Sequence, residues 1–303
     1  MRVLLESPER WTKVYCLSRR PPPPEMMDLL PAEQRSRVVH VASDFLSRPE
    51  EIAKAIKDEI KSVDVVFFYS YLQPKPKPGA GAWSNAQELV DVNSALLDNF
   101  LNALPLADLK PKRILLQTGA KNYGVHLGRA RAPYLESDPR VTLEPNFYYP
   151  QEDLLWKYCK ANDVSWNIIC PAWIIGAVNN AAMNALHPLA VYAAVQAHKG
   201  EPLHFPGDIE AWNGGSEHST AKLTGYLSEW AVLEESTKDQ KFNASDNCPI
   251  PANRLWPQLA SWFGVKEVGR PEADESKYTI VDPGDVPTPL GFVFPLLSRM
   301  FND

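Results

Sequence analysis

The chain has 303 residues, of which 45% are hydrophobic and 22% charged, enough for one large domain or two unequal halves around a sizeable core. Its formal net charge of -6 excludes the broad cationic surface of a nucleic-acid-binding protein. No stretch is long enough to span a membrane, and the N-terminus lacks the apolar core of a signal peptide. The composition therefore indicates a soluble protein, with the cytoplasm as its expected location.

Short β-branched and aromatic runs alternate with segments of helical period along the first part of the chain. The predicted strands are residues 13–17, 38–41, 63–69, 113–117 and 165–169. The predicted helices are residues 49–60, 84–104 and 151–162, with Ser47/Glu50 and Ser84/Gln87 as capping pairs for the first two. Strands that are apolar on both faces need helices on both sides of a sheet. The pattern predicts a doubly wound α/β fold of the Rossmann type, with a parallel sheet.

The pattern changes after Pro171. Helical segments at 181–199, 219–235 and 255–263 are mixed with turns that contain proline and tryptophan, and a loop-rich tail follows. We predict a dinucleotide-binding domain over residues 1–175 and a smaller, partly helical substrate lobe over residues 176–303. The lobe is expected to return to the first domain around residues 217–245.

The first predicted strand ends in Ser18, Arg19 and Arg20. In a dinucleotide fold this position meets the adenosine ribose, and arginine there suits a 2′-phosphate through charge-assisted bonds. The pair favours NADP(H) over NAD, although an exposed basic pair before a loop remains the alternative. Asp44 and Phe45, which follow the next strand, would suit the edge and face of the adenine.

The expected phosphate-binding turn is missing. A complete fold of this kind opens with a strand, a glycine-rich turn and a helix whose N-terminus holds the pyrophosphate. The first glycine here is Gly79, so residues 1–6 correspond to the end of that helix. The sequence therefore predicts that the first strand and its turn are absent. Two explanations stay open: an N-terminal truncation, or a protein that has lost normal cofactor binding.

The usual short-chain dehydrogenase signature is a tyrosine followed four residues later by a lysine on one helix. The match at Tyr71 and Lys75 contains Pro74 and cannot be a helix interior. Two other segments are more informative, residues 118–123 after a strand and residues 146–153 at a helix start. They supply Lys121 and Tyr148, although tyrosines at such positions are more often packed aromatics than catalysts.

These segments carry a resemblance to a known family. Leu-Gln-Thr-Gly-x-Lys-x-Tyr and Asn-Phe-Tyr-Tyr-x-x-Glu-Asp are similar to motifs of the progesterone 5β-reductase and iridoid synthase-like (PRISE-like) reductases, an atypical branch of the extended short-chain dehydrogenases. Fungal members of secondary metabolism look most alike. The likeness runs through almost the whole chain and includes Val14-Tyr15, Val92-Asn93, Cys170-Pro171-Ala172, Val191-Tyr192-Ala193-Ala194 and Ala211-Trp212.

The resemblance implies NADPH as cofactor and hydride delivery to the β-carbon of an enone. It assigns Tyr148 to stabilising the enolate oxygen and Lys121 to holding the phenol and the nicotinamide ribose in register. It assigns the cofactor to Ser18, Arg19, Arg20, Asp44, Phe45, Tyr69, Ser70, Thr118, Gly119, Pro171 and Ile174. It assigns the substrate to Phe147, Met183 and Asn184. No metal is expected, because the histidines show no ligand spacing.

Three positions depart from the family pattern: Asn122 replaces a usual histidine, residues 125–128 replace a Gly-Pro step, and Cys170 replaces a common arginine. They bear on substrate identity more than on reaction type. The sequence favours an NADPH-dependent reductase of an enone or carbonyl in a small apolar metabolite, compatible with a homodimer. The alternative is a truncated or degenerate Rossmann-fold protein that binds a metabolite or partner without redox turnover.

Overall fold

A four-stranded sheet with the order β10-β5-β4-β3 forms the centre of the computed structural model. The structure describes residues 1–75, 85–128, 130–178, 184, 186–272, 274, 276, 278–280 and 299–301. The sheet contains β3 (Val65–Phe68), β4 (Arg113–Gln117), β5 (Ser165–Pro171) and β10 (Gln240–Ala244). Every ladder between them is parallel, which confirms the predicted parallel sheet.

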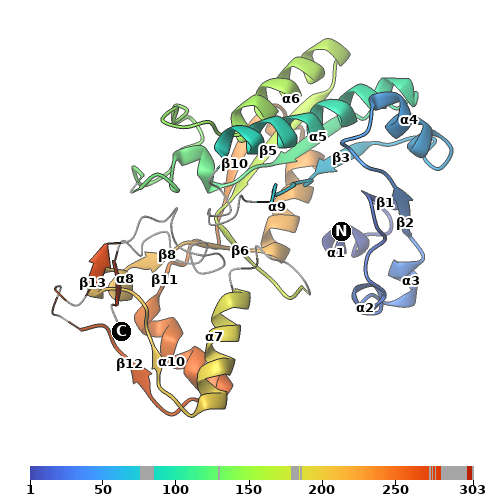
Figure 1. Ribbon diagram of the computed structural model, residues 1–303. Coiled ribbons are helices and arrows are strands. Elements are labelled where there is room, and N and C mark those ends of the chain that lie inside the picture. The colour runs from blue at the N-terminus through green and yellow to red at the C-terminus, as the bar shows by residue number, and fades with distance from the viewer. Residues whose placement is uncertain are drawn as a thin grey trace.

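Helices cover both faces of this sheet (Figure 1). On β4, Ile114 and Leu116 point into the apolar cluster formed with α5 (Ala86–Leu106) and α6 (Tyr148–Asn162), and α4 (Pro49–Lys57) packs on α5. Leu115 points the other way, into a cluster with α9 (Ala221–Leu233). Successive strand residues face opposite sides of a sheet. The double winding predicted from the sequence is therefore confirmed.

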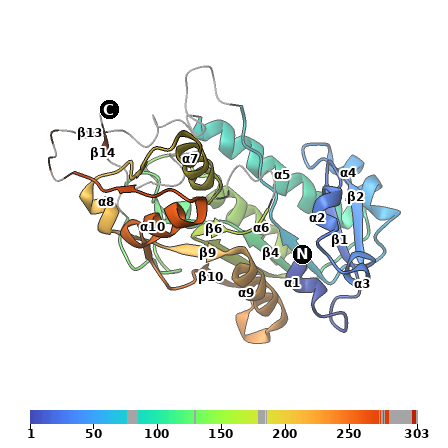
Figure 2. The ribbon, with the colours of Figure 1, turned by 90° about the horizontal axis from the view of Figure 1, so that it is seen from below.

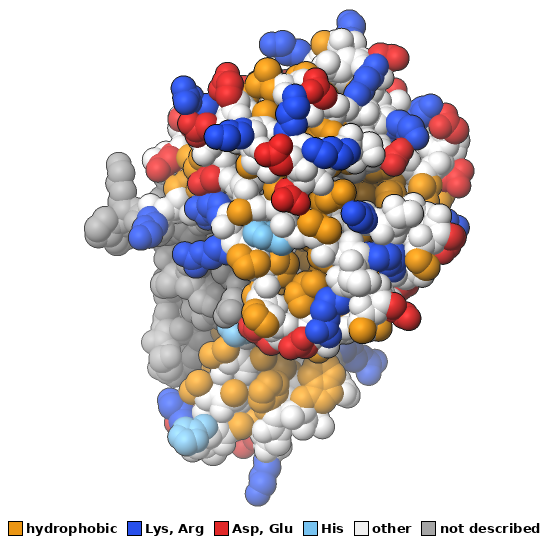
Figure 3. All heavy atoms as spheres, turned by 90° about the vertical axis from the view of Figure 1, so that its right-hand side faces the viewer, with side chains coloured by type: hydrophobic (Ala, Val, Ile, Leu, Met, Phe, Trp, Pro, Cys, Tyr) orange, Lys and Arg blue, Asp and Glu red, His pale blue; other side chains and the backbone are white. Residues whose placement is uncertain are grey.

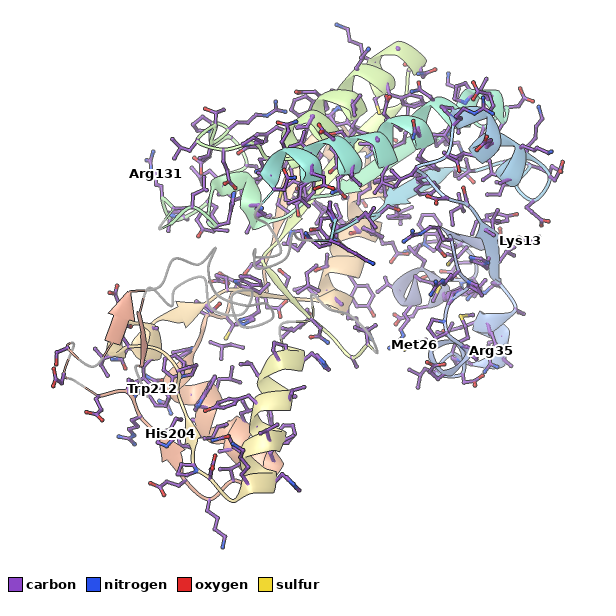
Figure 4. All side chains as sticks on the ribbon, viewed as in Figure 1. Lys13, Met26, Arg35, Arg131, His204 and Trp212 are labelled. Atoms are coloured by element: carbon purple, nitrogen blue, oxygen red, sulfur yellow. The ribbon has the colours of Figure 1, made fainter. Side chains whose placement is uncertain are left out.

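A second, two-stranded parallel sheet holds β1 (Val14–Ser18) and β2 (Val38–Ala42). The short helices α1 (Arg2–Leu5), α2 (Pro24–Met27) and α3 (Ala32–Arg35) accompany it, and Lys13, Met26 and Arg35 mark this unit in Figure 4. Within the described residues, no ladder joins β1 to β3. In dinucleotide folds of strand order 3-2-1-4-5-6, the first strand stands between the strands that correspond to β1 and β3. Among the described residues, β1 and β2 thus form a sheet separate from the four-stranded one.

A smaller lobe has its own apolar cluster between α7 (Leu186–Lys199), α8 (Ile209–Asn213) and α10 (Ala252–Phe263). Phe205 packs its ring against Trp212 and Trp256, with centroids 5.3 and 5.0 Å away. Figure 4 marks Trp212 and His204 in this lobe, and Figure 2 shows the lobe and the β1–β2 unit on opposite sides of the central elements. The boundary at residue 175 stays a prediction.

Short strand pairs and turns complete the fold. β6 (Trp173–Ile175) pairs with β9 (His218–Thr220), and β7 (Leu203–His204) with β12 (Val268–Gly269). β8 (Gly215–Ser216) pairs with β11 (Ile250–Pro251), and β13 (Tyr278–Ile280) with β14 (Arg299–Phe301). The 3₁₀ turns are η1 (Ala120–Tyr123) and η2 (Glu235–Thr237).

Both predicted helix caps are corrected by the structure. The N-cap of α4 is Arg48, and its guanidinium pairs with Glu51 at 3.0 Å, so Ser47 and Glu50 do not form the cap. In α5 the cap is Asn85, whose side chain accepts a hydrogen bond of 3.2 Å from the backbone N–H of residue 88. Ser84 lies outside the described residues. Because several polar residues precede each helix, spacing alone does not select the one that caps it.

Some helix boundaries also differ from the predicted ones. The helix predicted over 151–162 begins at Tyr148, whose N–H donates a hydrogen bond to the side-chain oxygen of Asn146 at 3.2 Å. This change places Tyr148 on the first turn of a helix. The helix predicted over 49–60 ends at Lys57, and the one predicted over 255–263 begins at Ala252. In the segment predicted over 181–199, the described helix begins at Leu186.

The described surface has two simple properties. On the face shown in Figure 3, acidic and basic side chains are interspersed, with no field of a single sign. Among the helices of the described residues, none has both the length and the hydropathy that a membrane span requires.

Candidate functional site

Three chain segments meet at the carboxyl ends of β4 and β5. Gly119 follows β4, Tyr148 opens α6, and Pro171 ends β5. A Cβ atom placed on Gly119 would lie 3.1 Å from the Tyr148 hydroxyl and 3.6 Å from the carbonyl oxygen of Pro171. The absence of a side chain at Gly119 therefore lets the phenol lie directly against the strand end. The carboxyl edge of a parallel sheet is where doubly wound folds bind their ligands.

Substituting Gly119 with alanine should crowd the phenol without straining the backbone. The φ angle of Gly119 is 174°, an extended value that any residue adopts, so the effect is steric. We expect Gly119→Ala to lower kcat/KM by about 10-fold or more, because small misplacements of a reacting group are costly. Gly214→Ala is the matched control, since its Cβ would be equally close, 3.1 Å, to a backbone oxygen far from Tyr148. Equal activity of the two variants would contradict the assignment.

The Tyr148 hydroxyl is prepared to donate a hydrogen bond. Burial, and then the neighbouring Tyr71 and Cys170, raise its pKa above the ordinary value, so the phenol stays protonated at neutral pH. Within the described residues, no protein group forms a hydrogen bond with this hydroxyl. A protonated, largely buried phenol of this kind can bind a ligand oxygen.

The adjacent Tyr149 has a structural role. Its hydroxyl donates to the carbonyl oxygen of Asn122 at 2.8 Å and accepts from the N–H of Val141, also at 2.8 Å. Its ring is buried beneath Arg140, with the guanidinium 5.0 Å from the ring centre. The structure therefore distinguishes the two tyrosines of the pair and leaves Tyr148 as the candidate catalytic group.

Lys121 lies on the η1 turn, which is tied to the start of α6. The side-chain amide of Asn146 donates to the Lys121 carbonyl oxygen at 2.9 Å and accepts from the Tyr148 N–H at 3.2 Å. Burial lowers the pKa of the Lys121 ammonium to about 8, and the carboxylate of Glu144 opposes part of that shift. His126, whose Nε2 lies 2.7 Å from a Glu144 oxygen, belongs to the same cluster. The interaction of Lys121 with the phenol stays a prediction.

An aromatic wall stands beside Tyr148. The ring of Phe147, predicted to face the substrate, lies 4.3 Å from that of Tyr148, and the ring of Tyr71 lies 5.6 Å from Phe147. Tyr71 follows β3 and was not assigned to the site from the sequence. The run of aromatic residues at the end of β3 is the sequence signal that indicates it. Tyr69 and Ser70, also at this strand end, share the carboxyl edge with Gly119.

The predicted ribose-phosphate residues follow β1. The Ser18 hydroxyl donates to the Arg20 carbonyl oxygen at 2.7 Å and lies 3.2 Å from His40 Nε2. Arg19 and Arg20 are exposed, and in the described part of the chain no carboxylate pairs with either guanidinium. The two guanidiniums are therefore available to an anion. Asp44 is exposed as well and accepts a hydrogen bond from the Leu46 N–H at 3.0 Å.

Some assigned side chains face elsewhere. Phe45 is a core residue whose ring lies 5.9 Å from Phe68 and 4.9 Å from Phe100, and its contact with an adenine stays a prediction. The Thr118 hydroxyl is buried 3.0 Å from the Cys170 sulfur, which leaves the Thr118 backbone at the strand end. The backbone conformation of the short loop after each strand decides which way these side chains point. A sequence motif does not specify that conformation.

The assigned residues beyond β5 are only partly described. Ile174 lies in β6, which pairs with β9. The side chain of Asn184 bonds locally, because it donates to the Gly176 carbonyl oxygen at 2.8 Å and accepts from the Leu186 N–H at 3.2 Å. Asn184 thus holds the start of α7. Met183 lies outside the described residues.

Three polar residues near the site had no role assigned from the sequence. The Glu144 carboxylate raises the pKa of Lys121 against the effect of burial, Asn146 joins η1 to α6, and Glu152 accepts a hydrogen bond from the Asn122 side chain at 3.1 Å. The signal for Asn146 is its position two residues before a helix start, which is typical of a capping side chain. Glu152 belongs to the Glu-Asp part of the second motif. Its burial depends on residues distant in the sequence, so the motif alone does not indicate it.

Comparison with known proteins places the site in context. The PRISE-like Rossmann-fold domain model matches residues 3–285. An uncharacterized protein of Schizosaccharomyces pombe is 31% identical over 260 residues, which are 84% of this chain and 60% of that protein. The 3-oxo-Delta(4,5)-steroid 5-beta-reductase of Arabidopsis thaliana is 35% identical over 62% of this chain and 50% of its own length.

Another curated relative extends the comparison. The (S)-8-oxocitronellyl enol synthase ISY1 of Nepeta racemosa is 31% identical over 84% of this chain and 62% of its own length. The chain thus spans between half and two thirds of the length of these relatives.

Solved structures show the same fold at low identity. A UDP-glucose 4-epimerase of Thermotoga maritima aligns with a TM-score of 0.62 and 13% identity, over 90% of this chain and 83% of its own. That similarity concerns the fold alone. The family model covers nearly the whole sequence and agrees with the motifs at the carboxyl edge of the sheet, so the chain belongs to the PRISE-like Rossmann-fold domain family.

Proposed function

We propose that this chain contains the catalytic part of an NADPH-dependent reductase. It would reduce the C=C bond of an enone by 1,4-reduction, or a carbonyl, in a small apolar metabolite. The single observation that carries the proposal is the Tyr148 hydroxyl, which is protonated at neutral pH, lacks a partner in the described structure and lies against Gly119 at the carboxyl edge. Relatives named as a steroid 5-beta-reductase and an enol synthase support the same chemistry.

The residues fit NADP(H) at its two ends. At the nicotinamide end, Gly119 and Pro171 lie against the Tyr148 hydroxyl at the carboxyl edge of the sheet, and Lys121 belongs to the turn that follows Gly119. At the adenosine end, Arg19 and Arg20 are exposed and have no carboxylate partner among the described residues. The pyrophosphate between them normally needs a glycine-rich turn at a helix start, and residues 1–78 contain no glycine.

The role of each residue follows from its chemistry. When bound, NADPH supplies the hydride. Tyr148 would donate a hydrogen bond to the substrate carbonyl oxygen, where negative charge develops, and such stabilisation contributes most when water is excluded. Lys121 would hold a ribose hydroxyl and the phenol in position with its ammonium. Phe147 and Tyr71 would shield the site with an apolar wall, which suits an apolar substrate.

Cofactor choice gives one prediction. Replacing both Arg19 and Arg20 with alanine should raise the Kd for NADPH by about 10- to 100-fold, because two charge-assisted bonds to a phosphate are lost. The Kd for NADH should change little. Fluorescence titration with both cofactors measures this. Arg35→Ala is the matched control, because Arg35 belongs to the same unit but pairs with Asp28 at 2.9 Å. An equal loss for both cofactors would contradict the NADP(H) assignment.

One observation favours a second candidate function, a Rossmann-fold protein that binds a metabolite or partner without redox turnover. It is the division of the sheet, in which no ladder between described residues joins β1 to β3. Incubation with deuterated NADPH and 2-cyclohexen-1-one, followed by mass spectrometry, separates the two. Deuterium on the β-carbon supports enone reduction, and deuterium on the carbonyl carbon supports carbonyl reduction. Binding of NADPH without transfer supports the second candidate.

A version extended at the N-terminus by a strand and a glycine-rich turn completes that comparison. If neither form binds NADPH, the reductase proposal fails. If only the extended form binds NADPH, the added turn binds the pyrophosphate, and the residues of this chain form the two ends of the cofactor site.

A further inference from the structure

A buried carboxylate lies next to the candidate site. Glu152 is only 2% exposed. One of its oxygens accepts hydrogen bonds from Asn122 Nδ2 at 3.1 Å and Lys241 Nζ at 3.0 Å, and the other accepts from Arg140 Nη2 at 3.0 Å. The turn η1, the helix α6, the strand β10 and the loop before α6 therefore meet at one carboxylate.

A buried carboxylate such as Glu152 depends on the cations that pair with it. Removing a charge from water is expensive, and an unpaired buried charge costs several kcal/mol. Two cations compensate Glu152, and each has other support. Arg140 also pairs with the exposed Asp153 at 2.8 Å, and the Lys241 ammonium lies 5.8 Å from the centre of the Tyr123 ring. The carboxylate is thus fixed in place and can orient a neutral partner.

That neutral partner is Asn122. Its Nδ2 donates to Glu152 and to the Thr118 hydroxyl at 3.1 Å, and it lies 3.6 Å from the Cys170 sulfur. Its Oδ1 is buried and has no hydrogen-bond partner among the described residues. A buried acceptor without a partner is costly, so another interaction must fix the amide in this orientation. The carboxylate of Glu152, which accepts but cannot donate, provides it.

We infer that Glu152 is a positioning residue, which acts through Asn122 to fix the η1 turn that carries Lys121 against the helix turn that carries Tyr148. The inference rests on the proposed function. Asn122 directly follows Lys121, and Glu152 lies one helical turn after Tyr148. Two other hydrogen bonds link η1 to the start of α6, one from the Asn146 side chain and one from the Tyr149 hydroxyl, and both end on backbone carbonyl oxygens of η1. Glu152 differs from them because it binds a buried side chain of η1, that of Asn122.

The test compares variants that remove or keep the acceptor. Glu152→Met should lower kcat by about 100-fold while the KM for NADPH changes less than about threefold, because misplacement affects the reacting groups. Glu152→Gln keeps an acceptor oxygen for Asn122 and should recover most of that loss. Asp153→Asn is the matched control, since Asp153 shares Arg140 but is exposed. We expect it to retain kcat within about threefold.

Asn122→Ala keeps the test decisive if the Met variant fails to fold. It leaves both ion pairs of Glu152 intact and should reproduce the loss of kcat. The two substitutions combined should cost no more than one alone, because they break the same link. Additive losses, or a folded Asn122→Ala protein with wild-type kcat, would overturn the inference.

A measurement without turnover separates this inference from the proposed function. After reductive ¹³C-methylation, the titration of Lys121, which faces Glu144 and His126, can be followed by NMR. In wild type we expect a pKa of about 8, and in Asn122→Ala a rise towards the ordinary lysine pKa of 10.5 as the turn admits water. An unchanged titration in the folded variant overturns the positioning role. A shifted titration in a protein without any turnover supports it and rejects the reductase.

Discussion

Tyr148→Phe is expected to lower kcat/KM by about 100- to 1,000-fold, the cost of losing one donor to a developing oxyanion. The substitution removes a single oxygen, and no hydrogen bond to another described group is lost with it. The Kd for NADPH and the free energy of unfolding should therefore stay near their wild-type values. Steady-state kinetics, a fluorescence titration and a urea unfolding curve measure the three quantities.

Tyr149→Phe provides the opposite pattern as a control. It removes the hydroxyl that joins Asn122 to Val141, so the protein should lose about 1–3 kcal/mol of unfolding free energy. The folded fraction should retain most of its activity. If Tyr149→Phe abolished turnover and Tyr148→Phe did not, the roles assigned to the two tyrosines would be reversed.

Lys121→Met is expected to lower kcat/KM by about 10- to 1,000-fold, because it removes the charge that would hold the ribose and the phenol. The wild-type enzyme should also lose activity as the pH rises through about 8, where the ammonium loses its proton. The residual activity of the variant should lack this limb. A pH–rate profile of both proteins is the measurement, and an identical limb in both would assign it to another group.

The stability contribution of Lys121 has the opposite pH dependence. Its pKa is about 8 in the folded protein, against the ordinary lysine pKa of 10.5 in the unfolded chain, so the unfolded chain binds more protons between these values. The free energy of unfolding of wild type, relative to the variant, should therefore rise with pH across that window. Activity and this stability difference thus change in opposite directions, which distinguishes loss of the ammonium from alkaline unfolding.

Residue patterns predict the interior of this fold well and its edges less well. The strand over 113–117 has the predicted bounds, because Ile114, Leu115 and Leu116 are buried on both faces and only a central strand fits them. Helix starts are harder to predict, because the cap of α5 is the side chain of Asn85, whereas α4 starts after Arg48 without any side-chain cap. The separation of β1 and β2 from the four-stranded sheet was not predicted from the residue pattern.

The candidate site was predictable where a motif fixes both residue and direction. Gly119 and Tyr148 lie together because the end of β4 and the start of α6 share one edge. The motif does not specify side-chain direction at Phe45, which is turned into the core by its packing against Phe100. Glu152 could not be assigned, because its partners come from segments up to 89 residues away.

Tyr148 and Lys121 are expected to border one pocket that holds a nicotinamide and a substrate carbonyl. A crystal structure of the protein with NADP⁺ and a bound enone tests it most directly. We predict the nicotinamide against Pro171, and the enone oxygen within about 3 Å of the Tyr148 hydroxyl. A ligand bound elsewhere, or Tyr148 and Lys121 enclosed in separate cores, would contradict the account.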